Sequence, residues 1–144
     1  WTVRFPSLAT HFDRLVSWTD RPEPGIRYFS GTATYTTTFV LPRSGPRAEL
    51  RLGTVEAIAR VRVNGEYIGT LWKYPYTIDI GAAVKPGENV LEIDVVNTWL
   101  NRLIGDERVN TGDSQTFVTV KTWKADTSLK PSGLLGPVTI TVTK

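Results

Sequence analysis

The chain has 144 residues, a formal net charge of +3 and no cysteine. This length suffices for one domain with a real core, and the lack of cysteine excludes a disulfide framework or a thiolate metal site. Its positive charges are scattered, and it has no apolar run long enough for a membrane span and no signal peptide, so we expect no nucleic-acid or membrane partner. Because it has no methionine and opens at Trp1, we expect a fragment of a longer protein or a processed piece.

Hydropathy alternates with a period of two along most of the chain, which predicts strands with one buried face. In segment 32–41, for example, Ala33 and Tyr35 share a face with Phe39 and Leu41, whereas threonines occupy the other face. No segment shows a sustained helical stripe. In chain order, the segments with strand alternation are 32–41, 50–52, 59–63, 76–80, 90–97 and 138–143.

Turn residues separate these segments. Asn64-Gly65 predicts a tight hairpin, because both residues tolerate positive φ. A proline-then-glycine turn follows at 85–89, and proline-bearing loops are expected at 19–25 and 42–46. About eight short strands at regular spacing predict a single all-β domain over residues 1–144, a β-sandwich or jelly roll.

Residues 97–135 form a long polar stretch, in which strand patterning is weak except around 116–120. Long loops on a rigid sandwich are where binding tends to reside. Asp106, Glu107 and Asp113 lie here among polar neighbours, which favours a solvated loop over the apolar pocket of a catalytic acid. We therefore expect loop-ordering hydrogen bonds, with a structural calcium ion as the alternative. The lone His11 cannot build a zinc site or a triad.

The aromatic residues carry the binding hypothesis. A sugar presents apolar C–H faces and hydroxyls, so an aromatic platform beside amide, carboxylate and guanidinium groups suits it. Asn101 and Arg102 would contact hydroxyls, and Arg102 could take the carboxylate of a uronic acid. Alternatively, the aromatics are core residues or anchors of a domain interface. The predicted ligand-binding residues are Trp72, Lys73, Tyr74, Trp99, Asn101, Arg102, Trp123 and Lys124.

Four motifs carry a resemblance that covers nearly the whole chain: GIRYFSGTATY (25–35), VRVNG (61–65), NTWLNRLIGD (97–106) and PSGLLGPV (131–138). With them the chain resembles the sugar-binding β-sandwich domain of family 2 glycoside hydrolases. It is closer still to the version in large bacterial α-L-rhamnosidase-type enzymes, glycoside hydrolase family 106. The segment 4–11 is shorter than expected for such a domain, and the catalytic part is not in this chain.

The resemblance implies a galactose-binding-domain-like jelly roll. It also implies a non-catalytic carbohydrate-binding domain of a bacterial glycoside hydrolase that is secreted, periplasmic or on the cell surface. The partners would be a plant or algal polysaccharide, or its side chains, and the catalytic domain of the parent enzyme. The main alternative is a structural domain that packs against the catalytic domain without binding sugar. A self-standing glycosidase or lyase that uses Asp106, Glu107 or Asp113, and a nucleic-acid binder, stand behind these two.

Overall fold

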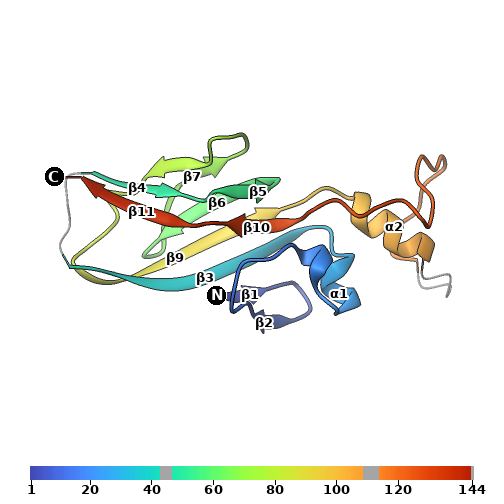
Figure 1. Ribbon diagram of the computed structural model, residues 1–144, viewed down its shortest axis with the longest axis horizontal. Helices are drawn as coiled ribbons and strands as arrows, with labels where there is room; N and C mark the ends of the chain where they lie inside the picture. The colour runs from blue at the N-terminus through green and yellow to red at the C-terminus, as the bar shows by residue number, and fades with distance from the viewer. Residues whose placement is uncertain (43–46, 109–113, 144) are drawn as a thin grey trace.

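The computed structural model describes residues 1–42, 47–108 and 114–143, and most of its regular structure is strand (Figure 1). The strands are β1 Thr2–Arg4, β2 Ala9–His11, β3 Thr32–Leu41, β4 Arg47–Arg51, β5 Thr54–Glu56, β6 Ile58–Val63, β7 Glu66–Leu71, β8 Thr77–Asp79, β9 Gly87–Val96, β10 Gly133–Gly136 and β11 Thr139–Thr143. The helical elements are η1 Trp18–Asp20, α1 Pro24–Arg27 and α2 Leu100–Arg108.

The strands form an antiparallel two-layer arrangement. The larger layer is a six-stranded sheet in the order β2-β1-β3-β9-β6-β7. A three-stranded sheet, β11-β4-β8, and a two-stranded sheet, β10-β5, make up the rest. The central pair β3 and β9 is in register over ten residues, from Thr32 opposite Val96 to Leu41 opposite Gly87. The prediction of an all-β sandwich is confirmed.

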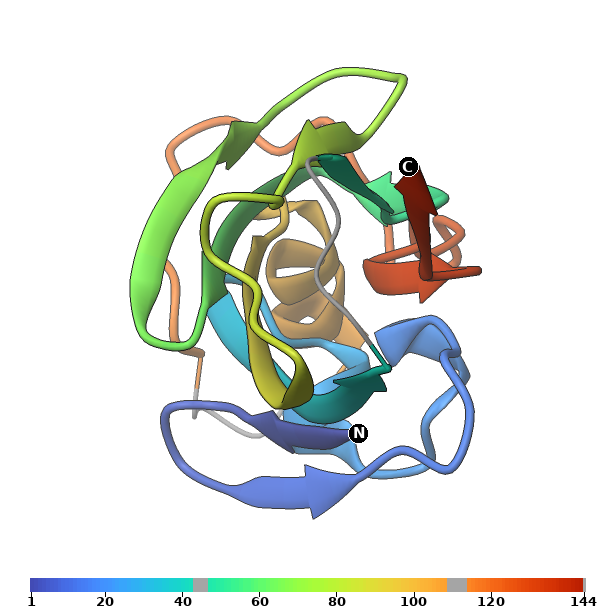
Figure 2. The ribbon, with the colours of Figure 1, turned by 90° about the vertical axis from the view of Figure 1, so that its left-hand side faces the viewer.

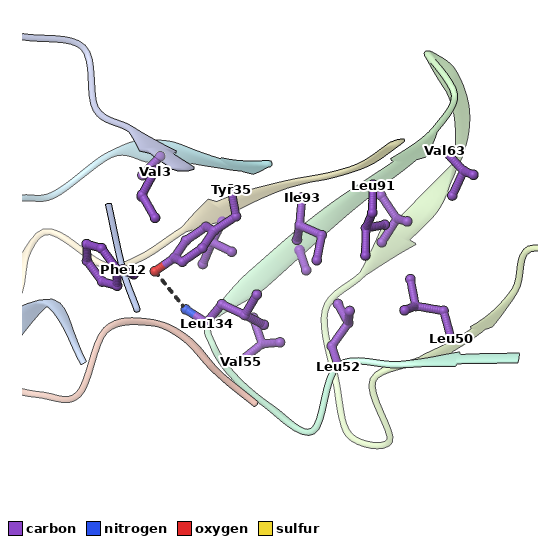
Figure 3. Packing of buried hydrophobic residues seen from close by; sticks show 14 of the residues in the cluster. Val3, Phe12, Tyr35, Leu50, Leu52, Val55, Val63, Leu91, Ile93 and Leu134 are labelled. Atoms are coloured by element: carbon purple, nitrogen blue, oxygen red, sulfur yellow. Dashed lines mark hydrogen bonds between the residues drawn. The ribbon is translucent and has the colours of Figure 1, made fainter. Parts of the chain in front are cut away.

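The core lies between the layers, where the inward faces of the alternating strands meet (Figure 3). Alternation predicts these faces correctly in β3, β6 and β9. The larger sheet contributes Ala33, Tyr35, Ala59, Val61, Val63, Leu91, Ile93 and Val95, and the opposite layer contributes Ala48, Leu50, Val55 and Leu134, all buried. Full burial of each large side chain stabilises the fold by roughly 1.5–3 kcal/mol.

A buried polar link joins the larger sheet to β10. The Tyr35 hydroxyl accepts a hydrogen bond from the Trp18 indole N–H at 2.6 Å. It accepts another from the Leu134 backbone N–H at 3.2 Å (Figure 3). Burial raises the pKa of Tyr35 to about 12, although the bonds from Leu134 and Trp18 oppose that shift. Gly133 has a positive φ of 101°, and a Cβ there would lie 2.5 Å from the Trp18 indole nitrogen.

The hairpin predicted at Asn64-Gly65 is confirmed. Asn64 has φ 52° and Gly65 has φ 83°, as a tight turn between β6 and β7 requires. The Asn64 side chain also accepts a hydrogen bond from the Val90 N–H at 3.0 Å and donates one to Asn89 Oδ1 at 2.9 Å. The turn is therefore tied to the start of β9.

Helical structure and segment 116–120 depart from the expectations. The interior of 97–135 holds helix α2, and the expected loop 19–25 overlaps η1 and α1. Residues 116–120 form no strand. The helix was missed because Leu100, Leu103 and Ile104 supply only one apolar turn, too short to establish a helical period.

Helix α2 lies at one end of the long axis (Figure 1). A view along that axis shows it behind the strands of the sandwich (Figure 2). Among the helices that the structure describes, none has the length and apolar character needed to cross a bilayer.

Candidate functional site

Two asparagines of the motif NTWLNRLIGD fasten helix α2 to the sandwich. The Asn97 amide donates to the Phe29 carbonyl at 2.8 Å and to the Ser132 hydroxyl at 3.1 Å, and its oxygen accepts from the Gly31 N–H at 2.9 Å. The Ser132 N–H in turn donates to Ser17 Oγ at 3.0 Å. Four distant segments of the chain therefore meet at the base of the helix.

Asn101 makes further contacts of this kind, and they do not favour its predicted role as a ligand contact. Its side chain donates to the Lys130 carbonyl at 2.7 Å and to Ser132 Oγ at 2.9 Å, and accepts from the Lys130 N–H at 2.8 Å. The residue is only 2% exposed. With its amide used in this way, Asn101 has no free group to offer a sugar.

Arg102 is also engaged within the chain rather than free to bind a carboxylate. Its guanidinium pairs with the Asp106 carboxylate one turn along α2, at 2.6 Å, and both side chains are largely buried. The same guanidinium lies 6.0 Å from the ring centre of Tyr28, against which Gly105 also packs. The prediction that Arg102 reads ligand hydroxyls or a uronate is therefore not supported by its contacts.

Asp106 orders the segment that follows α2. Besides Arg102, its carboxylate accepts hydrogen bonds from the Thr116 hydroxyl at 2.5 Å and the Gln115 N–H at 3.1 Å. Burial alone would raise the pKa of Asp106, but the Thr116 hydrogen bond and the nearby charge of Arg102 outweigh burial and lower it. A catalytic acid needs a raised pKa, so this carboxylate does not suit that role.

The suggested calcium ion would need free carboxylate and carbonyl oxygens, but the Asp106 carboxylate already accepts hydrogen bonds from groups within the chain. Glu107 is paired with the Lys121 ammonium at 2.5 Å. Within the ranges that the structure describes, no three or more His, Asp or Glu side chains gather into a metal cluster. Asp113, which the sequence grouped with Asp106 and Glu107, lies outside those ranges.

The strongest candidate site is a cleft between α2 and residues 114–123, which we call the α2 cleft. It has a volume of about 290 Å³. Its lining residues are Leu103, Asp106, Glu107, Ser114, Thr116, Phe117, Val118, Lys121 and Trp123. Aromatic rings, two carboxylates and an ammonium group therefore border one hollow.

A second hollow of about 390 Å³ adjoins the α2 cleft and includes Trp99. The two share Leu103 and residues 116–118 as walls. Trp99 is 65% exposed and Phe117 is 90% exposed. The structure therefore brings Trp99 and Trp123, two of the predicted site residues, to neighbouring hollows beside α2.

Trp123 and Lys124 differ in their surroundings. Trp123 is half-buried, and its indole N–H is enclosed without a hydrogen-bond partner in the described part of the chain. Lys124 is exposed, does not line the α2 cleft, and its backbone N–H donates to Thr127 Oγ1 at 2.8 Å. Trp123 is thus placed for ligand contact, whereas Lys124 is not.

The remaining predicted residues, Trp72, Lys73 and Tyr74, lie on the loop between β7 and β8. Trp72 is 67% exposed and Tyr74 is 82% exposed. The Lys73 ammonium lies 5.2 Å from the centre of the Trp72 ring. This loop projects from the side of the sandwich, between its two ends, whereas α2 lies near one end (Figure 1). The predicted residues therefore form two separate aromatic surfaces rather than one site.

Phe117 and Lys121 were not among the predicted site residues, and Glu107 was weighed only as a catalytic or calcium-binding acid. An exposed Phe within a polar stretch was the available indication for Phe117. Nothing in the sequence shows that Glu107 faces Lys121, because fourteen residues separate them in the chain.

Arg60 and Arg62 share the outer face of the large sheet but form no free basic patch. The Arg62 guanidinium donates to both carboxylate oxygens of Asp94, at 2.8 and 3.0 Å, and lies 3.7 Å from Glu92. The absence of a nucleic-acid partner stays a prediction.

Comparison with known proteins gives the family. Residues 20–130 match the family model described as "Glycosyl hydrolase 2 galactose-binding domain-like". A protein of Formosa agariphila named "Putative beta-glucuronidase" is 43% identical over 99% of this chain. The structure of a rhamnosidase from Novosphingobium sp. PP1Y superposes on 97% of this chain with a TM-score of 0.92 and 41% identity. A β-D-glucuronidase of Dictyoglomus thermophilum covers 68% of it at 27% identity and a TM-score of 0.59.

The chain spans only a small part of these relatives. It covers 15% of the Formosa protein, 14% of the Novosphingobium rhamnosidase and 18% of the Dictyoglomus enzyme. Both resemblances, to family 2 enzymes and to a rhamnosidase-type enzyme, are confirmed, as is the galactose-binding-domain-like fold. The relatives are glycoside hydrolases by name, and the shared region is a non-catalytic domain of such enzymes. The chain belongs to the galactose-binding-domain-like family of glycosyl hydrolase 2.

Proposed function

We propose that this chain is a carbohydrate-binding accessory domain of a glycoside hydrolase and that sugar binds in the α2 cleft. The observation that carries the proposal is that Phe117 and Trp123 line one hollow of about 290 Å³ together with two carboxylates and an ammonium group. Ring faces suit the apolar C–H face of a sugar, and the charged groups suit its hydroxyls. The volume lies near the lower end for ligand pockets, roughly 300–1,000 Å³.

The contacts within the chain hold several parts of the cleft in place before a sugar arrives. Glu107 is fixed on α2, and Lys121 is held against it at 2.5 Å. Segment 114–116 is tied to α2 through Asp106. Such pre-organisation lowers the entropic cost of binding. Because one or two sugar rings bury little area, we expect a weak affinity, on the order of millimolar (about −4 kcal/mol).

Hydrolysis would take place in another domain of the parent protein, and we propose an α-L-rhamnosidase-like activity there. The rhamnosidase similarity over 97% of this chain supports this assignment, and the chain's small share of that enzyme leaves room for a catalytic domain. The accessory domain would hold polysaccharide near the active site and raise the local substrate concentration.

The test is titration of the chain with a glycan panel by calorimetry, with Trp123→Ala and Phe117→Ala as variants. Each should weaken binding at least about fivefold, the equivalent of roughly 1 kcal/mol from lost ring contact. Tyr67→Ala is the matched control, because Tyr67 is an exposed aromatic on β7 outside the α2 cleft. Unchanged binding in both cleft variants would remove the α2 cleft as the site.

A second candidate function, docking onto a catalytic domain without sugar binding, is favoured by the β7–β8 loop. Exposed Trp and Tyr side chains on a projecting loop are typical anchors of protein interfaces. In the full-length parent enzyme, the double variant Trp72→Ala/Tyr74→Ala should then increase protease cleavage between the domains. Cleavage at the parent rate would remove this candidate.

The compartment and the polysaccharide are further parts of the proposal. We propose a bacterial parent enzyme that is secreted, periplasmic or on the cell surface and that acts on a plant or algal polysaccharide. Fractionation of the source cells with an antibody against this chain tests the compartment. Recovery of the antigen only in the cytosol would contradict it.

A further inference from the structure

We infer that the α2 cleft selects neutral sugars and rejects uronic acids. This inference rests on the proposed function and specifies the class of sugar. It follows from how the charged groups in and behind the cleft are already paired.

The guanidinium groups near the cleft are engaged. Arg102 is held by Asp106 at 2.6 Å, with a side chain that is only 15% exposed. Arg108, at the end of α2, donates to the backbone carbonyls of Ala125 at 2.8 Å and Thr127 at 2.9 Å. Neither side chain lines the α2 cleft, so neither is placed there for the two-pronged contact by which arginine recognises a sugar carboxylate.

The ammonium of Lys121 is the only cation among the residues that line the described cleft, and it is paired with Glu107 at 2.5 Å. A uronate carboxylate would have to compete with Glu107 for this ammonium and would lie close to a second negative charge. Asp106, the other lining acid, is balanced by Arg102. The cleft therefore has no surplus positive charge to offset a carboxylate that loses its hydration.

A neutral sugar meets no such obstacle. Each hydroxyl both donates and accepts, so two adjacent hydroxyls can bridge the Glu107 carboxylate, which accepts, and the Lys121 ammonium, which donates. Because the ion pair is partly exposed, with the Lys121 side chain 55% and the Glu107 side chain 33% accessible, both groups can reach a ligand while they stay paired. The same pair that recognises a diol thus disfavours an acid.

The experiment compares matched sugars on the intact 144-residue chain by nitrogen–proton correlation NMR. The probes are methyl β-D-glucopyranoside and its 6-carboxylate, the galactose and mannose pairs of the same kind, and methyl α-L-rhamnopyranoside. The indole N–H signal of Trp123, assigned with Trp123→Phe, reports the cleft. At least one neutral glycoside should shift it, and the matching uronoside should bind at least about fivefold more weakly, equivalent to about 1 kcal/mol.

The variant Glu107→Gln separates charge from shape. Because glutamine keeps the approximate shape of the side chain and removes its negative charge, the variant should bring the affinities for the two members of a pair within about twofold (about 0.4 kcal/mol). Glu66→Gln, an exposed acid on β7, is the control and should keep the discrimination.

The outcomes separate the two claims. A uronoside that binds Trp123 as tightly as its neutral partner would overturn the selectivity and leave the proposed function standing. Discrimination that persists in Glu107→Gln would also overturn the inference, since the like charge would not be its cause. No shift of the Trp123 signal with any probe would overturn both the inference and the α2 cleft as the sugar site.

Discussion

Asn101→Ala should destabilise the fold strongly while leaving sugar affinity per folded molecule unchanged. Asn101 makes three hydrogen bonds to Lys130 and Ser132, with lengths of 2.7, 2.8 and 2.9 Å. Each such bond contributes about 1 kcal/mol net, and a buried partner left unpaired costs about 1–3 kcal/mol. Because Lys130 is exposed, water can replace part of what it loses. We therefore expect a loss of about 2–3 kcal/mol.

A loss of this size is large beside a typical total stability of about 5–15 kcal/mol. In a chain of this length it corresponds to a fall in Tm of roughly 8–12 °C. The assay is urea denaturation followed by tryptophan fluorescence, in which the midpoint should fall with little change in slope. Trp99→Ala is the control within the same motif, because Trp99 is 65% exposed and should change stability by less than about 0.5 kcal/mol.

A fall in the free energy of unfolding below about 0.5 kcal/mol for Asn101→Ala would refute the role of Asn101 in holding α2 against the sandwich. A selective loss of glycan binding with unchanged stability would restore Asn101 as a ligand residue. Either result would mean that the hydrogen bonds to Lys130 and Ser132 do not hold α2 in place.

Three further changes test other contacts. Tyr35→Phe leaves two buried N–H donors unpaired and should lower the free energy of unfolding by about 2–3 kcal/mol in denaturant melts. The pKa of Tyr35 is raised from 10.0 to about 12, so the parent should lose stability as the pH rises over that range, and the variant should lose less. Asp106→Asn should cost about 1–3 kcal/mol at neutral pH. The pKa of Asp106 is lowered from 3.8, so its contribution is present above that pH and lost as the pH falls below it, and acid melts of the variant should be flatter. Trp72→Ala should shift the denaturation midpoint by less than about 0.5 kcal/mol, and a larger loss would mean that this indole packs into the fold.

The strands were predictable because their side chains alternate between two environments. Ala33 and Tyr35 are fully buried, as the period of two predicts, and Asn64-Gly65 adopts the positive φ values that its hairpin requires. These features depend on neighbours a few residues away, so the local sequence contains the necessary information.

Helix α2 was less predictable because its stability comes from distant contacts. A glycine such as Gly105 inside a helix lowers the stability of the helix by about 1 kcal/mol relative to alanine, so it argues against a helix in the sequence. In the structure, a Cβ at this position would lie 2.7 Å from Tyr28, so the glycine permits the helix to pack closely. That contact spans the fold and is invisible in a local window.

The candidate site was only partly predictable for the same reason. Residue type identified Trp99 and Trp123 as possible ligand contacts but could not separate them from Asn101, which differs in burial. Trp72 and Trp99 were predicted to serve the same ligand, whereas Trp99 lines the hollow beside Leu103 and Trp72 lies on the loop between β7 and β8. Side-chain chemistry suggested what could bind, and only the arrangement in space showed where.

A crystal structure of the chain with a glycan that it binds in solution tests the central claim most directly. We predict a sugar ring against Phe117 and Trp123, with hydroxyls at the Glu107 carboxylate and the Lys121 ammonium. A glycan stacked instead on Trp72 and Tyr74 of the β7–β8 loop, with the α2 cleft empty, would contradict it.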